Sequence, residues 1–217
     1  MASEPTRLPA GPAPLRAWWL RTALVLSAPR AVFVALRADG DEEAAQRSEP
    51  VLAIVLLAGI AFVLSTSTTA HIMDTDQNGL HYDGLLVAVW VFLAGAFFGA
   101  VGYWLLGAAL HLPSVLLGSQ GSFRRSRHVL AFAAVPVVCS LALWPLKLLL
   151  YGDALFRAGG ADAGTGGDAF AVVSVGFLAW SLCLLVIGVR AVHGWGLGRA
   201  LAAAAAPVAV GAAVYLL

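Results

Sequence analysis

Residues 85–110 read LLVAVWVFLAGAFFGAVGYWLLGAAL, an apolar stretch without a single charged side chain. A helix rises about 1.5 Å per residue and the hydrocarbon core of a bilayer is about 30 Å thick, so about 20 apolar residues cross it. The stretch is continuously apolar instead of alternating, which favours a helix over a strand of a membrane barrel. It therefore predicts a transmembrane helix.

Four further stretches have the same character, and they predict transmembrane helices at about residues 51–69, 129–150, 169–189 and 200–217. Composition agrees, because 60% of the residues are hydrophobic and only 12% are charged, whereas soluble domains carry about 25% charged residues. We predict an all-α fold, a polytopic membrane helix bundle with five transmembrane helices. The net charge of +1 gives no reason to expect a nucleic-acid partner.

The positive charges alternate between the connections of this bundle. Cytoplasmic loops of membrane proteins retain Lys and Arg. Of the 13 Lys and Arg residues, only Lys147 and Arg157 lie on one side, and the other eleven precede the first stretch or lie in the second and fourth connections. The count predicts a cytoplasmic N-terminus and a C-terminus outside.

The residues ahead of the bundle form two segments. Residues 1–16 are Pro-rich and lack the apolar content to fold, which predicts a disordered leader. Residues 17–49 mix aromatic and aliphatic side chains with arginines and end in an acidic linker, the composition of an amphipathic helix in the membrane interface. We expect Pro29 to divide this helix, and we expect residues 50–217 to form the membrane domain.

The first outer connection holds the stretch most similar to a ligand-binding motif. Asp74, Asp76 and Asn78 alternate ahead of a glycine, as in the opening of an EF-hand calcium loop. The bidentate Glu that ends such a loop is missing, and Asp, Asn and Gly also suit a polar turn. We expect a turn and no cofactor, with a metal site at these three residues as the alternative.

Gly95 and Gly99 form a GxxxG pattern in the second predicted helix. Small residues at this spacing let another helix approach closely. That helix belongs either to the same chain, which we favour, or to a second copy in an oligomer.

Arg124, Arg125 and Arg127 form a compact basic cluster in the second inner connection. Arginines in this place can contact anionic lipid headgroups. The rule that cytoplasmic loops retain positive charge explains the cluster without a further role.

No Asp or Glu lies inside any predicted transmembrane helix, and Lys147 is close to the outer end of the third. Proton-coupled transport, ion-coupled transport and intramembrane hydrolysis usually need ionisable groups within the membrane. We therefore predict that the chain is not an enzyme. Pro136 and Pro145 are expected to bend the third helix, because each removes a backbone donor.

Four short segments carry a family resemblance: SAPRAVF at residues 27–33, SEP at 48–50, GSFR at 121–124 and AAVP at 133–136. In these segments the chain resembles the Yip family, membrane proteins named in eukaryotes for binding Rab-type GTPases, and especially its bacterial branch. The resemblance implies a five-span helical domain with a cytoplasmic N-terminus, here in a bacterial plasma (inner) membrane. It does not extend to GTPase binding, because the Asp-Leu-Tyr-Gly-Pro motif of the eukaryotic members is missing.

Two functions are compatible with these patterns. The first is a non-enzymatic scaffold or adaptor in membrane organisation, which contacts the lipid bilayer and recruits a cytoplasmic protein partner through residues 17–49 and the basic inner loops. The alternative is a permease or channel for a small neutral or lipophilic solute, built around the bent third helix. A polar cavity reaching the middle of the membrane would favour the alternative, and a solid apolar bundle would favour the scaffold.

Overall fold

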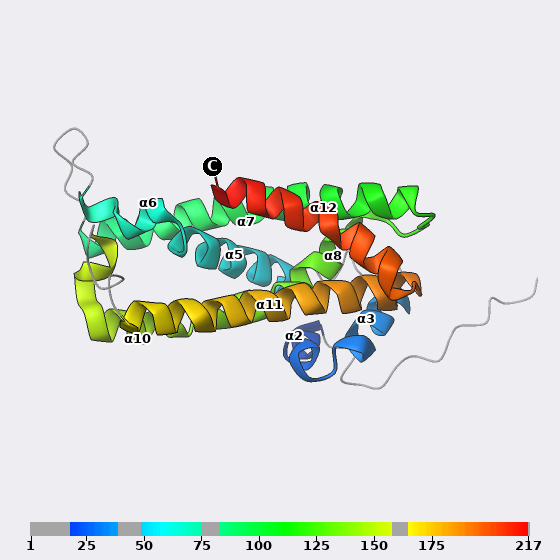
Figure 1. The fold of residues 1–217 in the computed structure, drawn as a ribbon, viewed down its shortest axis with the longest axis horizontal. Helices are drawn as coiled ribbons and strands as arrows, with labels where there is room; N and C mark the ends of the chain where they lie inside the picture. The colour runs from blue at the N-terminus through cyan, green and yellow to red at the C-terminus, as the bar shows by residue number, and fades with distance from the viewer. Residues whose placement is uncertain (1–17, 39–48, 75–82, 158–164, 217) are drawn as a thin grey trace, which may run out of the picture.

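The computed structural model describes residues 18–38, 49–74, 83–157 and 165–216, and most of these residues are helical. Apolar helices lie side by side along the long axis of the molecule, and the chain reverses direction between one long helical stretch and the next (Figure 1). The α-helices are α2 Trp18–Ser27, α3 Pro29–Ala38, α5 Glu49–Leu64, α6 Ser67–Ala70, α7 Gly84–Leu116, α8 Phe123–Ala133, α9 Val135–Ser140, α10 Leu143–Tyr151, α11 Thr165–His193 and α12 Leu197–Leu216, and the short 3-10 turns are η1 Ile72–Asp74 and η2 Gly152–Phe156.

The prediction of a polytopic helical bundle is confirmed. By length and composition, four helical stretches can cross a membrane, namely Gly84–Leu116, Phe123–Phe156, Gly166–His193 and Leu197–Tyr215. The fifth apolar helix, Pro50–Leu64, is shorter. No strand occurs in the part of the chain that the structure describes.

Helix α5 ends earlier than the predicted stretch at residues 51–69. The hydroxyl of Ser65 donates to the carbonyl of Phe62, and that of Thr66 donates to the carbonyl of Val63, both at 2.7 Å. Thr66 has extended backbone and caps the separate short helix α6. Because these side-chain bonds compete with helical ones, α5 has only 16 residues, a length of about 24 Å.

The third predicted helix is divided into α8, α9 and α10. The breaks fall at Ala134 and at residues 141–142, shortly before Pro136 and Pro145. The helix is thus interrupted close to the two prolines that were expected to bend it. Physically, each proline lacks the N–H that would bond the preceding turn, and its ring crowds that turn.

Two glycines of α7 bring α5 and α7 into close backbone contact. Gly95 and Gly99 are buried against Gly59 and Ile60 of α5, and a Cβ on Gly59 would meet the backbone carbonyl of Gly95 and the backbone N of Gly99. The GxxxG pattern is therefore used within the chain, which is the alternative that we favoured. A second copy has no access to these two glycines in this fold.

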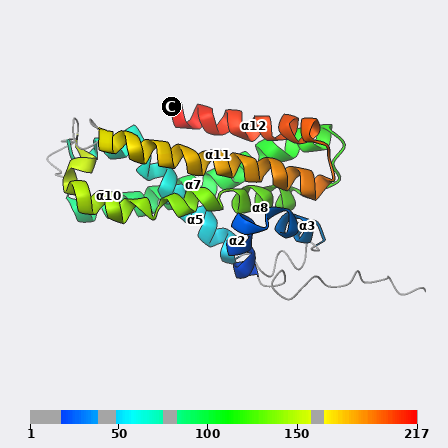
Figure 2. The same cartoon turned by 60° about the horizontal axis from the view of Figure 1, so that its bottom comes forward.

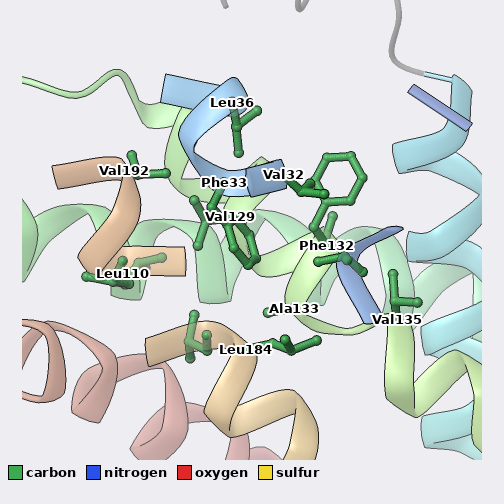
Figure 3. Close-up of a cluster of buried hydrophobic side chains, with 14 of the residues drawn as sticks. Val32, Phe33, Leu36, Leu110, Val129, Phe132, Ala133, Val135, Leu184 and Val192 are labelled. Atoms are coloured by element: carbon green, nitrogen blue, oxygen red, sulfur yellow. The ribbon is translucent and has the colours of Figure 1, made fainter. Parts of the chain in front are cut away.

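Two apolar clusters fill the bundle. The smaller one joins the end of α5, the start of α7 and the turns η1 and η2. The larger one joins α2, α3, α8, α9 and α11 with the start of α5, the last part of α7 and the start of α12. Figure 3 shows its centre, where Phe33 of α3 lies among Val129 and Phe132 of α8, with Leu184 of α11 beneath them.

Most of the described arginines lie at one end of the bundle. We call the end where α3, the last turns of α7 and α11, and the starts of α8 and α12 meet the arginine-rich end. Apart from Glu49, which begins α5, the described carboxylates lie at the opposite end, at Asp74, Asp83, Asp153 and Asp168.

Candidate interaction site at the arginine-rich end

Helix α3 is held on the bundle by one apolar face. Val32 and Phe33 are fully buried and Leu36 is 2% exposed, and the helix packs on α11 and α8. Gly188 of α11 makes room for the Phe33 ring, because a Cβ there would lie 2.9 Å from the ring. The apolar face that the sequence predicted to enter the membrane interface is thus covered by protein.

The chain breaks between α2 and α3 at Ala28, directly before Pro29. The prediction that Pro29 divides the amphipathic segment is confirmed, and Pro29 begins α3, a position where the missing N–H of proline costs nothing. Figure 2 shows the two short helices beneath α8. The break lets both helices contact the bundle, and α2 adds the fully buried Val25 to the larger cluster.

The opposite face of α3 forms one wall of an open groove of about 960 Å³. The other wall is the end of α11 and the turn after it, and the apolar part of the lining includes Val34 and Ile187. Three arginines line the groove, namely Arg30 and Arg37 of α3 and Arg190 of α11. All three are exposed.

The turn after α11 fixes the inner corner of this groove. Gly194 has a positive φ of 66°. This left-handed backbone conformation favours glycine and is common directly after the end of a helix. A Cβ placed on Gly194 would lie only 3.3 Å from Nη1 of Arg37, so the guanidinium group of Arg37 sits over the end of α11. The following Trp195 lines the groove and stacks on His193, with ring centroids 4.5 Å apart.

Serine and histidine side chains tie the α7–α8 connection to this corner. Ser119 Oγ and His193 Nδ1 lie 3.0 Å apart, and the backbone N–H of Gly121 donates to Ser119 Oγ at 2.9 Å. A second pair, Ser126 Oγ and His111 Nδ1, is 3.4 Å apart. The first pair holds the loop that ends in the GSFR segment beside the end of α11, and the second joins α8 to α7.

The predicted basic cluster has members in different surroundings. The guanidinium carbon of Arg127 lies 3.8 Å from the centroid of the Trp104 ring, 4.9 Å from that of Tyr103 and 4.8 Å from that of Phe123. Cations stack favourably on aromatic faces, so Arg127 joins α8 to α7. Arg124 and Arg125 are half-buried and take part in further interactions.

The predicted metal ligands are only partly described. Asp74 lies in η1 and its carboxylate is 3.9 Å from Nη1 of Arg157, whereas Asp76 and Asn78 lie outside the described residues. Within residues 18–38, 49–74, 83–157 and 165–216, no group of three or more His, Cys, Asp or Glu side chains is arranged to hold a metal ion.

Sequence reasoning missed the groove, although one signal for it was present. Arg30 and Arg37 are seven residues apart, which is about two helical turns, so they share a face of α3. That face lies opposite the buried residues Val32, Phe33 and Leu36. The contribution of Arg190 was not visible, because only the docking of α3 on α11 brings it to the same groove.

Comparison with known proteins identifies one family. Residues 23–217 match the model of the Yip1 domain. The match begins within α2 and includes every later described helix. No curated protein and no solved structure matches the chain.

Proposed function

We propose a scaffold function for this chain, which belongs to the Yip1 domain family. In the proposal this multi-pass membrane protein places its arginine-rich end in the cytoplasm, presents α2 and α3 to a cytoplasmic protein partner, and catalyses no reaction. The membrane is a bacterial plasma (inner) membrane. The observation that carries the proposal is the docking of α3, because three buried side chains hold an otherwise exposed, arginine-bearing helix at one end of an apolar bundle.

The separation of charge supports the orientation. Arginines on cytoplasmic segments are retained inside, and Arg30, Arg37, Arg190 and Arg199 are exposed at the same end of the bundle. The described Asp residues lie at the other end. This placement agrees with the cytoplasmic N-terminus that the resemblance implied.

The packing supports a scaffold more than a permease. The two clusters fill the described bundle with aliphatic and aromatic side chains, and the residues that line the groove belong to the arginine-rich end. A solute pathway would instead need a polar-lined cavity near the middle of the membrane.

The orientation is tested with single cysteines. Cys139 and Cys183, the native free cysteines, are first replaced by alanine, and Asp153→Cys or Arg199→Cys is then introduced at an exposed position. A membrane-impermeant maleimide is expected to label Cys at position 153 in intact cells and at position 199 only after permeabilisation. The reverse pattern would show that the arginine-rich end faces outward.

The partner surface is tested by site-specific photocrosslinking in native membranes. Trp19 and Leu20 of α2 are 57% and 51% exposed, and large exposed apolar side chains mark interaction surfaces. A photoreactive residue at either position is expected to crosslink a protein of one discrete mass. The matched control is Phe97 of α7, which is 63% exposed and should crosslink lipid; a lipid-only result at Trp19 and Leu20 as well would refute the partner surface.

A further inference from the structure

We infer that the groove between α3 and α11 binds an anionic phospholipid, with its phosphate on Arg30, Arg37 and Arg190 and its acyl chains along the apolar lining. The inference goes beyond the scaffold function and does not depend on a protein partner. It rests on the residues of the groove, their charge, and the position of the groove at one end of the bundle.

The first support is the number of guanidinium groups that share the groove. Arginine binds phosphate oxygens through paired N–H donors, which makes it the preferred residue for phosphate recognition. Arg30, Arg37 and Arg190 come from two helices that are held together by the buried face of α3. Their relative positions are therefore fixed by the fold and not by a flexible tail.

The second support is the like charge of the three arginines that line the groove. Three like charges in one groove repel one another, and a bound phosphate group relieves that repulsion.

The third support is the apolar lining, which selects a lipid over a free phosphate ion. Val34, Ile187 and Ala191 line the groove beside the arginines. Val34 is 49% exposed, an apolar surface that a phosphate ion would leave in water. Ile187 and Ala191 belong to α11, an apolar helix long enough to cross the membrane, so this wall continues from the headgroup level toward the hydrocarbon.

The fourth support is Trp195 in the groove lining. Tryptophan is enriched at the membrane–water interface, where its ring sits at the level of the headgroups. Basic pockets between membrane helices on the cytoplasmic side are suited to headgroups with several negative charges. This groove combines a tryptophan with a basic pocket between helices.

The test is native mass spectrometry of the full chain in detergent with defined lipids. Cardiolipin, phosphatidylglycerol and phosphatidylethanolamine are titrated separately, and inorganic phosphate is added as a competitor. We expect the affinity to increase with the negative charge of the headgroup, so that cardiolipin binds most tightly. The triple variant Arg30→Gln, Arg37→Gln, Arg190→Gln is expected to bind cardiolipin about 100-fold more weakly, from about fivefold for each arginine.

The matched control removes the same charge elsewhere, by Arg7→Gln, Arg157→Gln and Arg199→Gln, and is expected to keep wild-type affinity. An equal loss in both triple variants would overturn the proposal, because it would reduce the effect to net charge. Displacement of cardiolipin by inorganic phosphate at equal concentration would overturn the assignment to a lipid. A conservative triple variant with Lys at the three groove positions should recover part of the affinity, which separates lost binding from lost folding.

Discussion

Replacing Gly59 with Val is expected to destabilise the bundle by about 3 kcal/mol, at the upper end of the usual cost of overpacking. A Cβ at this position meets backbone atoms of Gly95 and Gly99, and backbone cannot move aside as the end of a flexible side chain can. Helices α5 and α7 must therefore separate along their whole contact. Thermal unfolding in detergent, followed by size-exclusion chromatography, should show the midpoint lowered by about 10 °C.

The matched control for this prediction is Gly102→Val on α7. No atom outside the local helix lies within 4 Å of a Cβ at Gly102, so the same change of residue type leaves the crossing intact. Its midpoint should stay close to that of the wild type. If the unfolding midpoints of Gly59→Val and Gly102→Val fell equally, helix propensity and not the crossing would explain the effect.

Phe33→Asp is expected to release α3 from the bundle. Phe33 is fully buried against Gly188 and Val129, and removing a buried Phe side chain alone costs about 3–5 kcal/mol. The introduced carboxylate adds the cost of burying a charge. Because proteases cut a helix only after it opens locally, brief trypsin treatment should cleave the variant after Arg30 and Arg37, while the wild type stays uncut at these two positions.

The neighbouring substitution Val34→Asp provides the control. Val34 is 49% exposed and belongs to the groove face of the same helix. The variant should resist trypsin as the wild type does, since its new charge stays in water. Rapid cleavage of both variants would show that α3 is not anchored through its buried face.

The apolar stretches could be recognised from the sequence because hydrocarbon imposes a simple requirement. A helix that crosses lipid must satisfy its own backbone bonds and present apolar side chains over its length, and residues 85–110 display this directly. The bends at Pro136 and Pro145 were predictable for a similar reason, because they follow from the geometry of one residue. The early end of α5 could not be predicted, because the hydroxyls of Ser65 and Thr66 can bond helix carbonyls with or without ending the helix.

The roles of particular arginines were less predictable. Arg124, Arg125 and Arg127 are close in sequence and look equivalent, but the guanidinium group of Arg127 lies over the rings of Tyr103 and Trp104 of α7. Arg30 and Arg190 are far apart in sequence and line one groove. Such contacts depend on which helices pack together, and local patterns carry no information about that.

The sequence by itself determined that this chain is an apolar helical bundle with eleven of its 13 Lys and Arg residues assigned to one side, because solvation by lipid acts on each segment separately. Only the tertiary structure decided that α3 docks on α8 and α11, that Gly59 meets Gly95 and Gly99, and that three arginines share one groove. These features arise from complementary shapes of segments distant in sequence, and packing of that kind is a property of pairs of helices and not of either helix alone.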